Sequence, residues 1–311
     1  MHRLARLAAA FTCLGLLLVG GCNGQDKTGN DSTLPEHSVD PAADQAALAA
    51  VEVTGTPGVE PTIDFTPPLT LTDNVARRAA PGTGEVVNVG DAVVVQILAV
   101  DGNDGAVVSS SYQSSPELLM VDEAQMPLPV MAALVDSQVG ARILYAAPTE
   151  AGTTVIWAFE IERVISVPEH AEGTVVEPAP GLPEVYYTDA GLPQITPAMG
   201  NPPEQLVVQP LIVGSGEEVR EDSKLIIQYI AWFWDGTRAG NSWELGTGVP
   251  ITLAGSIEGW REGLLGAKIG SEVMLVVPPS MGRQSDLNPA DLEGTPTNAT
   301  MVYIVDILAG I

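Results

Sequence analysis

The chain has 311 residues, a formal net charge of -26, 45% apolar residues and 5% aromatic residues. This length fits two domains, and the apolar content is sufficient for ordinary globular cores. So large a negative charge argues against nucleic acid as a partner, because an acidic surface repels a phosphate backbone.

The first 22 residues have the features of an export signal. Basic residues near the start precede an apolar run, Leu7 to Leu18, which is too short to favour a membrane-spanning helix. Val19-Gly20-Gly21-Cys22 then resembles the lipobox of a bacterial lipoprotein signal peptide. The resemblance implies a signal peptide over 1–22, lipidation of Cys22, and anchoring at the extracytoplasmic face of the cell membrane. The alternative is an ordinary signal peptide cut nearby, with Cys22 incidental.

Residues 23–51 are predicted to form a disordered acidic tether. The stretch NGQDKTGNDSTLPEHSVDPAADQ has almost no large apolar residues, so burial cannot offset the entropy lost on ordering. We therefore expect the folded part to begin near residue 52. Cys13 and Cys22 are the only cysteines, so the mature chain has no pair for a disulfide.

An internal repeat organises the rest of the chain. The segment GTGEVVNVGDAVVVQ, at 82–96, aligns without gaps on GSGEEVREDSKLIIQ, at 214–228, an offset of 132 residues. The alignment continues to the turn Asp104-Gly105, which matches Asp235-Gly236 when one extra residue is allowed. The repeat predicts two copies of one domain, 52–167 and 193–311, joined by a Pro- and Glu-rich linker at 168–192. Chance similarity between two β-rich segments is the alternative.

The second copy is predicted to be an antiparallel α+β domain. The expected strands carry apolar residues on both parities, so the sheet is covered on both faces, with a short helix near 257–265 on one of them. These strands are expected near 206–213, 223–233, 249–253, 272–278 and 300–308.

Several segments of this copy together resemble the FKBP-type peptidyl-prolyl isomerases. They are GSGEEV at 214–219, LIIQYIAWFWDG at 225–236, IEGWREGLLGAKIG at 257–270, LVVPPSMG at 275–282 and NATMVYIVDIL at 298–308. The resemblance covers about the last third of the chain. It implies an antiparallel sheet wrapped around a short helix, peptidyl-prolyl cis-trans isomerase activity and no cofactor.

The family pattern assigns four site residues. Trp260 matches the tryptophan of the pocket floor, and Ile257 matches the apolar residue whose backbone amide holds the substrate carbonyl. Tyr229 and Tyr303 match aromatic walls on the long strand and the last strand. Each of the three aromatic residues is also compatible with plain core packing.

Three positions depart from the family pattern. The family's Phe-Asp pair falls on Ala239 and Gly240, and its loop tyrosine falls on Arg283. These changes remove aromatic walls and a carboxylate, so we expect a shallower pocket and reduced activity. Trp232 is expected to pack in the sheet, while Trp234 and Trp243 could replace the missing wall.

The residue types limit the chemistry of the second copy. Residues 193–311 contain no histidine and no cysteine, which excludes a catalytic histidine, a thiolate nucleophile and a Cys/His metal site. An apolar pocket can still accelerate rotation about an Xaa-Pro bond, because the twisted amide is less polar than the planar one. The partners implied are proline-containing segments of exported proteins.

The first copy has lost the family's aromatic positions. Ile97 stands at the position of Tyr229, and Val130 stands approximately at that of Trp260. We interpret this copy as a degenerate, non-catalytic domain. Three functions stay open: a lipid-anchored isomerase acting on exported proteins, a non-catalytic peptide-binding chaperone, and an inert envelope scaffold.

Overall fold

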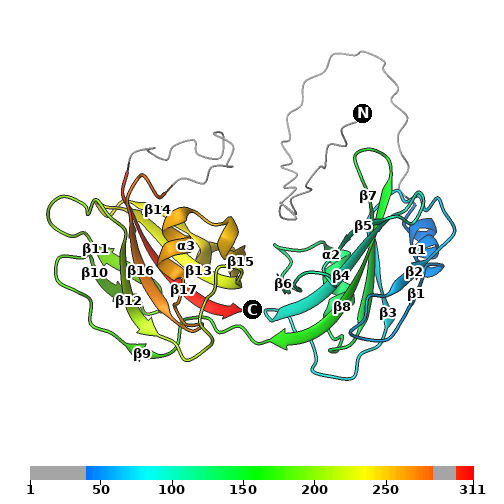
Figure 1. Cartoon of the computed structure of the whole chain (residues 1–311), viewed down its shortest axis with the longest axis horizontal. Helices are drawn as coiled ribbons and strands as arrows, with labels where there is room; N and C mark the ends of the chain where they lie inside the picture. The colour runs from blue at the N-terminus through cyan, green and yellow to red at the C-terminus, as the bar shows by residue number, and fades with distance from the viewer. Residues whose placement is uncertain (1–39, 283–298) are drawn as a thin grey trace, which may run out of the picture. The chain divides into compact units, whose positions relative to one another are not determined.

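The computed structural model describes residues 40–282 and 299–311, and its strands form two large antiparallel sheets (Figure 1). The predicted signal peptide with Cys22, and also Arg283, lie outside these residues. Each large sheet carries one short helix on one face. The predicted fold class, an antiparallel α+β fold in two tandem copies, is confirmed. Within the described ranges, no helix is long and apolar enough to cross a membrane.

The first sheet has six strands in the order β3-β7-β8-β4-β5, with β6 also paired to β4. The strands are β3 (Val75–Ala80), β4 (Ala92–Asp101), β5 (Val107–Ser110), β6 (Glu117–Met120), β7 (Arg142–Pro148) and β8 (Thr154–Ile165). Helix α2 (Leu128–Leu134) buries Val130 and Leu134 against one face of this sheet. Runs of Val, Ile and Leu favour these strands because branched side chains pack well on a pleated surface.

The predicted tether is too long at its C-terminal end. Pro41–Ala49 form helix α1, and β1 (Glu52–Thr54) then pairs with β2 (Thr62–Asp64). The Asp40 carboxylate caps the helix by accepting from the Ala43 N–H, and Pro41 begins it, a residue well suited to a first turn. Leu48 is fully buried in the other apolar cluster of the first domain. The prediction relied on the polarity of the whole stretch and overlooked an alanine-rich segment with both start signals.

The second sheet has seven strands in the order β14-β13-β17-β16-β12-β9, with β15 also paired to β13. The strands are β9 (Thr174–Val175), β12 (Val207–Val213), β13 (Lys224–Phe233), β14 (Arg238–Asn241), β15 (Val249–Thr252), β16 (Glu272–Val277) and β17 (Met301–Gly310). Two short 3-10 helices, η1 (Ser242–Leu245) and η2 (Leu253–Gly255), precede helix α3 (Glu258–Leu264). The bounds of β12, β13, β15, β16, β17 and α3 lie within two residues of the predicted ones, whereas β9, β14 and the two 3-10 helices were not predicted.

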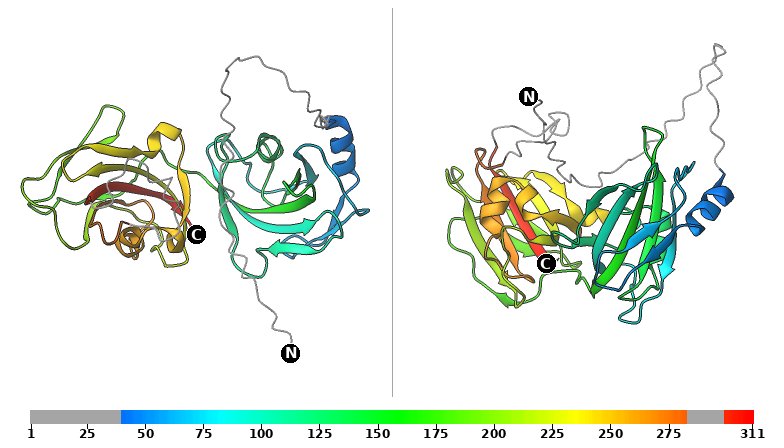
Figure 2. Two further views of the ribbon diagram at one scale, coloured as in Figure 1. Left: turned by 90° about the horizontal axis from the view of Figure 1, so that it is seen from above. Right: turned by 45° about the vertical axis from the view of Figure 1, so that its right-hand side comes forward.

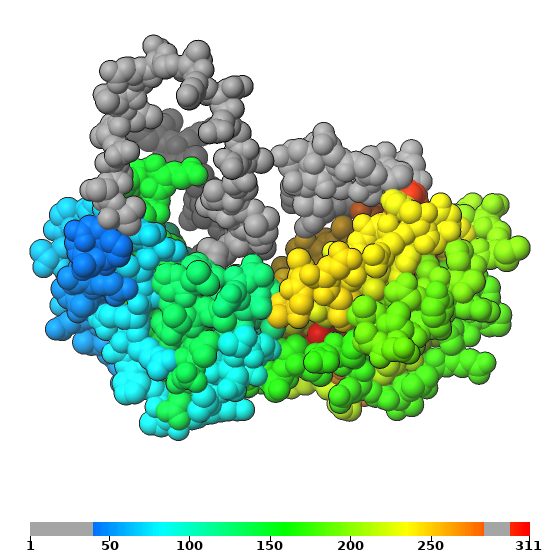
Figure 3. Space-filling view, turned by 180° about the vertical axis from the view of Figure 1, so that it is seen from behind, coloured from blue at the N-terminus to red at the C-terminus, as the bar shows by residue number. Residues whose placement is uncertain are grey.

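The predicted linker, 168–192, is part of the second domain's structure. It contributes β9 to the sheet and β10 (Glu184–Tyr187), which pairs with β11 (Pro193–Thr196). Helix α3 covers one face of the sheet, and apolar residues of the β10-β11 hairpin pack against the other (Figure 2). The light-green atoms of this segment lie against yellow atoms of the second domain in Figure 3. Its prolines suggested a spacer, but pairing with other strands gives this segment its order.

Candidate functional site

Two glycines place helix α3 very close to strand β16. A Cβ atom added to Gly259 would lie 2.5 Å from Val277 Cγ1, and one added to Gly263 would lie 2.6 Å from Leu275 Cδ2. These residues are four apart, so they lie on one face of the helix. The Gly259 N–H also donates to the Met281 carbonyl at 3.0 Å. The spacing of these two glycines is visible in the sequence, but their contact with β16 is not.

This close packing brings the three predicted aromatic residues together. The Trp260 ring lies 5.2 Å from the Tyr229 ring and 5.4 Å from the Tyr303 ring, measured between centroids. Interplanar angles of 75° and 88° make both contacts edge-to-face, an arrangement that aromatic quadrupoles favour. Trp260 is 8% exposed, and both tyrosines are half-buried. We refer to Tyr229, Trp260 and Tyr303 as the aromatic floor.

Ile257 lies beside this floor as the N-cap residue of α3. Its carbonyl accepts from the Trp260 and Arg261 N–H groups, both at 3.0 Å, and its side chain packs against the same cluster. Its own N–H has no acceptor among the described residues. The role of this amide in holding a carbonyl stays a prediction.

The floor is apolar, with few hydrogen-bonding groups. Burial raises the pKa of Tyr229, and burial followed by the nearby Tyr229 raises the pKa of Tyr303 to about 12, so both phenols are neutral at physiological pH. The indole Nε1 of Trp260 is buried and has no acceptor in the described part of the chain. Within that part, no group of three or more His, Cys, Asp or Glu side chains could hold a metal ion.

Two of the three positions that depart from the family pattern, Ala239 and Gly240, lie on β14; the third, Arg283, lies outside the described residues. Ala239 is exposed, and Gly240 is half-buried beside the floor. A Cβ on Gly240 would lie 3.8 Å from Tyr229 Cε2, an ordinary van der Waals distance. A larger side chain could thus be accommodated here, and none is present.

The suggestion that Trp234 or Trp243 replaces the missing wall is wrong. Both pack against the cluster on the opposite face of the sheet, where the Trp243 ring stacks on His170 at 6.2 Å. Trp232, at 3% exposure, belongs to the same cluster, so its predicted role in sheet packing is confirmed. Side chains alternate between the two faces of a sheet along a strand. Trp232 and Trp234 are two residues apart, so both rings lie on the face opposite the aromatic floor.

The face of the first sheet that α2 covers also contains aromatic rings, but they stand at other positions. Val130 is the third residue of α2, as Trp260 is of α3. Beneath α2, Tyr145 stacks on Trp157 at 5.2 Å, and both pack with the cluster that contains Val130. Valine stands where α3 has Trp260, as the alignment indicated. The expectation that this face has no aromatic floor is wrong, because the neighbouring strands supply Tyr145 and Trp157.

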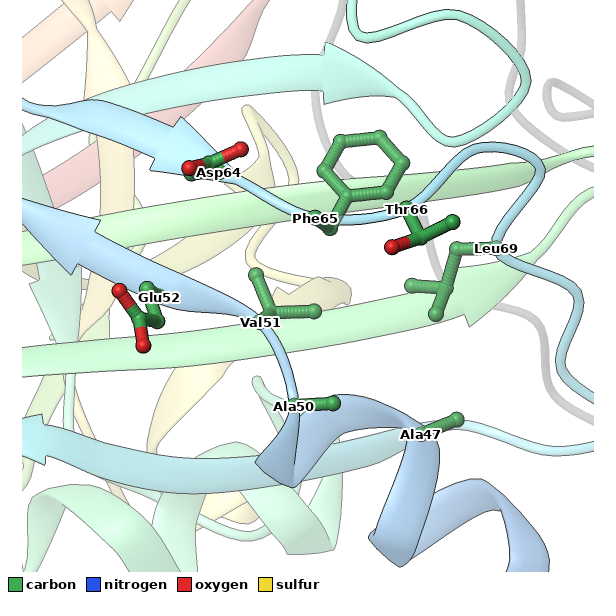
Figure 4. A pocket seen from close by; sticks show the side chains of 8 residues that line it. All are labelled: Ala47, Ala50, Val51, Glu52, Asp64, Phe65, Thr66 and Leu69. Atoms are coloured by element: carbon green, nitrogen blue, oxygen red, sulfur yellow. The ribbon is translucent and has the colours of Figure 1, made fainter.

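The first domain also has a cavity of about 400 Å³ beside α1 and the β1-β2 pair (Figure 4). Val51, Phe65 and Leu69 give it apolar walls, while Glu52 and Asp64 face each other in register on the two strands. None of these residues corresponds to the aromatic floor. This cavity is therefore not the first domain's version of the second domain's site.

The fold and the floor define a class of protein: a small antiparallel α+β domain with a cluster of aromatic rings between its helix and its sheet. The family model "FKBP-type peptidyl-prolyl cis-trans isomerase" matches residues 215–308. The chain is 33% identical over 118 residues to a "Probable FK506-binding protein" of Corynebacterium glutamicum, covering 38% of this chain and 97% of that protein.

The chain therefore belongs to the FKBP-type peptidyl-prolyl cis-trans isomerase family. It is also 33% identical over 103 residues to the isomerase FkpA of Escherichia coli K12, covering 33% of this chain but only 37% of FkpA. The crystal structure of FkpA aligns with 27% identity over 42% of this chain and 52% of that chain, with a TM-score of 0.31.

Proposed function

We propose that the second domain catalyses cis-trans isomerisation of Xaa-Pro bonds at the aromatic floor. The observation that carries the proposal is the meeting of three rings beside the free Ile257 N–H. The floor accepts the flat proline ring, and the Ile257 N–H donates to a carbonyl of the bound peptide. The Trp260 Nε1 offers a second unpaired donor at the base of the site.

The proposed mechanism needs no acid, base or nucleophile. Rotation about the Xaa-Pro bond has a barrier of about 18–20 kcal/mol because the planar amide is resonance-stabilised. The twisted amide has lost this resonance and is less polar, so an apolar floor stabilises it relative to the planar form. A hydrogen bond from Ile257 would hold the flanking peptide while the bond rotates.

Reduced activity is part of the proposal. The exposed Ala239 and the small Gly240 supply no aromatic wall on the β14 side, so a bound proline would be less completely removed from water. The same openness favours a second function, in which the site binds prolyl segments as a chaperone without accelerating rotation. In both cases the ligands are proline-containing segments of exported proteins.

Exchange in a short Xaa-Pro peptide, followed by NMR with the full chain, tests the isomerase proposal. Trp260→Leu should lower kcat/KM about tenfold or more, because it removes both edge-to-face contacts and the floor itself. Trp157→Leu, on the equivalent face of the first domain, is the matched control and should leave kcat/KM unchanged. Absence of acceleration by the unaltered chain, with the peptide still bound, would replace the isomerase by the chaperone.

We further propose that lipidated Cys22 anchors the protein at the extracytoplasmic face of the cell membrane. The support is the lipobox-like sequence that ends at Cys22. In the native host, Cys22→Ser should abolish labelling by radioactive palmitate and release the protein from the membrane fraction. Cys13→Ser, which alters the only other cysteine, should leave both unchanged. Retention of label in Cys22→Ser would contradict the anchor.

A further inference from the structure

A row of polar side chains crosses the face of the second sheet opposite the aromatic floor. Gln228 on β13, Asp306 on β17 and Glu272 on β16 are direct neighbours in strand register. All three are nearly fully buried, with exposures of 4%, 1% and 2%. We refer to them as the back row.

The back row contains two adjacent acids and no cation. The Tyr187 hydroxyl donates to Glu272 Oε1, and the Ala171 N–H donates to Asp306 Oδ2 at 2.8 Å. Asp306 Oδ1 receives no donor from the described residues. Burial, followed by the charge of Glu272, raises the pKa of Asp306 to about 8, so a shared proton takes the place of a cation at neutral pH.

The first domain has the same row with one decisive difference. Gln96, Glu160 and Arg142 are neighbours on β4, β8 and β7, as Gln228, Asp306 and Glu272 are in the second domain. The two glutamines correspond in the internal repeat, and each Oε1 accepts from a serine hydroxyl, of Ser111 or of Ser242. Arg142 therefore occupies the position of Glu272.

The guanidinium of Arg142 completes the row in the first domain. It forms a buried ion pair with Glu160 at 2.6 Å and donates to the carbonyls of Gly55 and Thr56, both at 2.9 Å. The Tyr112 hydroxyl donates to Glu160 at 3.3 Å, as Tyr187 donates to Glu272 in the second domain. The second domain thus keeps a carboxyl group, Asp306, at the position of Glu160, and it keeps a tyrosine that donates to the row. At the position of Arg142 it has a second carboxyl group, Glu272.

A cavity opens where that cation is missing. It measures about 290 Å³ and is lined by His170, Ala171, Tyr187, Ile212, Glu272 and Asp306, among others. At about 30 Å³ for each liquid water, this volume suits roughly ten waters or a group of similar size. No ion pair joins His170 to either carboxyl within residues 40–282 and 299–311.

We propose that this cavity binds a guanidinium group from outside the domain, which occupies the place that Arg142 fills in the first domain. The unpaired Asp306 Oδ1 and the adjacent Glu272 supply the acceptors, and a planar guanidinium can donate to both carboxyls at once. A divalent metal ion fits less well, because calcium requires six to eight oxygen ligands. The donor is a small guanidine or an arginine side chain of a peptide.

Calorimetric titration of the full chain tests the proposal. The probes are methylguanidine, acetyl-Gly-Arg-Gly-amide, the citrulline analogue of that peptide, and calcium chloride. Citrulline has nearly the shape of arginine without its charge. Saturable binding of either guanidinium probe, with no binding of the citrulline peptide, is the expected result. Tighter binding of the arginine peptide than of methylguanidine identifies a peptide as the source, and the reverse identifies a small molecule.

Substitutions of Glu272 and Asp306 test whether the probes bind in this cavity. Glu272→Gln and Asp306→Asn should each weaken binding about tenfold, because each removes one of the two carboxyl groups that accept from the guanidinium. Glu272→Arg should abolish binding, since it supplies the group found in the first domain. The exposed Glu123→Gln is the control and should bind as the unaltered chain does. Thermal unfolding verifies that each variant is folded.

Three results would each overturn the proposal: no saturable binding of either guanidinium probe, equal binding of the citrulline peptide, or binding that Glu272→Gln and Asp306→Asn leave unchanged. Binding of calcium alone would also overturn it. Because the row lies on the face opposite the aromatic floor, these outcomes are independent of the isomerase assay.

Discussion

The two domains cover equivalent sheet faces with helices of seven residues, α2 and α3, yet their third residues are Val130 and Trp260. In the second domain the tryptophan meets two tyrosines edge-to-face, beside the Ile257 N–H, which has no acceptor among the described residues. In the first domain the rings of Tyr145 and Trp157 stack with each other instead. The cover helix is therefore a feature of the fold, and the candidate site depends on a few residues beneath and within it.

The opposite faces differ in charge. Arg142 neutralises Glu160 inside the first domain, whereas Glu272 and Asp306 leave the second domain with two buried acids. A buried acid is costly unless a cation or a proton accompanies it. In the first domain the Arg142 guanidinium accompanies the buried acid. In the second domain a proton shared by Glu272 and Asp306 takes this role.

The largest expected effect comes from breaking the ion pair of the first domain. Arg142→Met leaves Glu160 buried without its cation, which should lower the free energy of unfolding by about 3–5 kcal/mol. Glu272→Met, at the matched position of the second domain, removes one of two like charges and should change it by less than about 1 kcal/mol. Urea unfolding followed by circular dichroism measures both. Equal losses in the two variants would contradict the difference in charge between the two rows.

The next effect comes from moving α3 off its sheet. Gly259→Ala places a Cβ 2.5 Å from Val277 Cγ1, so the helix must shift, at a cost of about 1–3 kcal/mol. This shift should also lower isomerase activity, because Trp260 is the next residue. Ala133→Gly in α2 is the control: it should cost about 0.5–1 kcal/mol and leave activity unchanged. Full activity in Gly259→Ala would show that the glycine contact does not position the floor.

Most of the second sheet could be predicted from sequence because its signals are local. Runs of apolar residues on both parities marked β13, β16 and β17, and the predicted bounds lie within two residues of the observed ones. Helix α1 was missed because Pro41–Ala49 are mostly small or polar and are stabilised by distant contacts. Asp44, for example, accepts from the Thr72 and Asp73 N–H groups. Strand β9 was missed for a similar reason, since two exposed residues become a strand only by pairing with β12.

The candidate site could be predicted only in part. The aromatic floor followed from a family resemblance that included Trp260 and both tyrosines. The back row could not be found this way, because Glu272 and Asp306 are 34 residues apart and become neighbours only through the register of β16 and β17. The wrong suggestion for Trp234 and Trp243 has the same origin: ring type is visible in a sequence, but the face of the sheet is not.

A smaller effect should appear in the pH dependence of stability. Burial raises the pKa of both Glu272 and Asp306, while the Ala171 N–H lowers that of Asp306 and His170 lowers that of Glu272. Tyr187 and Gln228 are the other polar groups at this row. The folded state therefore holds a proton that the unfolded state releases near pH 4, so this pair lowers stability as pH rises from about 4 to about 8.

Asp306→Asn removes this dependence. For one proton, the free energy of unfolding changes by at most about 1.4 kcal/mol per pH unit. The stability of Asp306→Asn relative to the unaltered chain should therefore increase progressively from pH 5 to pH 8. Thermal unfolding across this range measures the difference, with Glu123→Gln as the control. A difference that stays constant with pH would mean that the pair holds no shared proton.

The smallest expected effect is a gain of function on β14. Ala239→Phe with Gly240→Asp restores the aromatic wall and carboxylate of the family pattern, and the space beside Tyr229 accepts a Cβ at 3.8 Å. An added aromatic contact is worth about 0.5–1.5 kcal/mol, so kcat/KM should rise about two- to tenfold. In the first domain Ser109 pairs with Ala99 as Gly240 pairs with Ala231, so Val108 and Ser109 hold the equivalent positions. Val108→Phe with Ser109→Asp is the control and should confer nothing, because Val130 stands in place of the helix tryptophan. A gain in both domains would show that the wall, rather than the aromatic floor, limits activity.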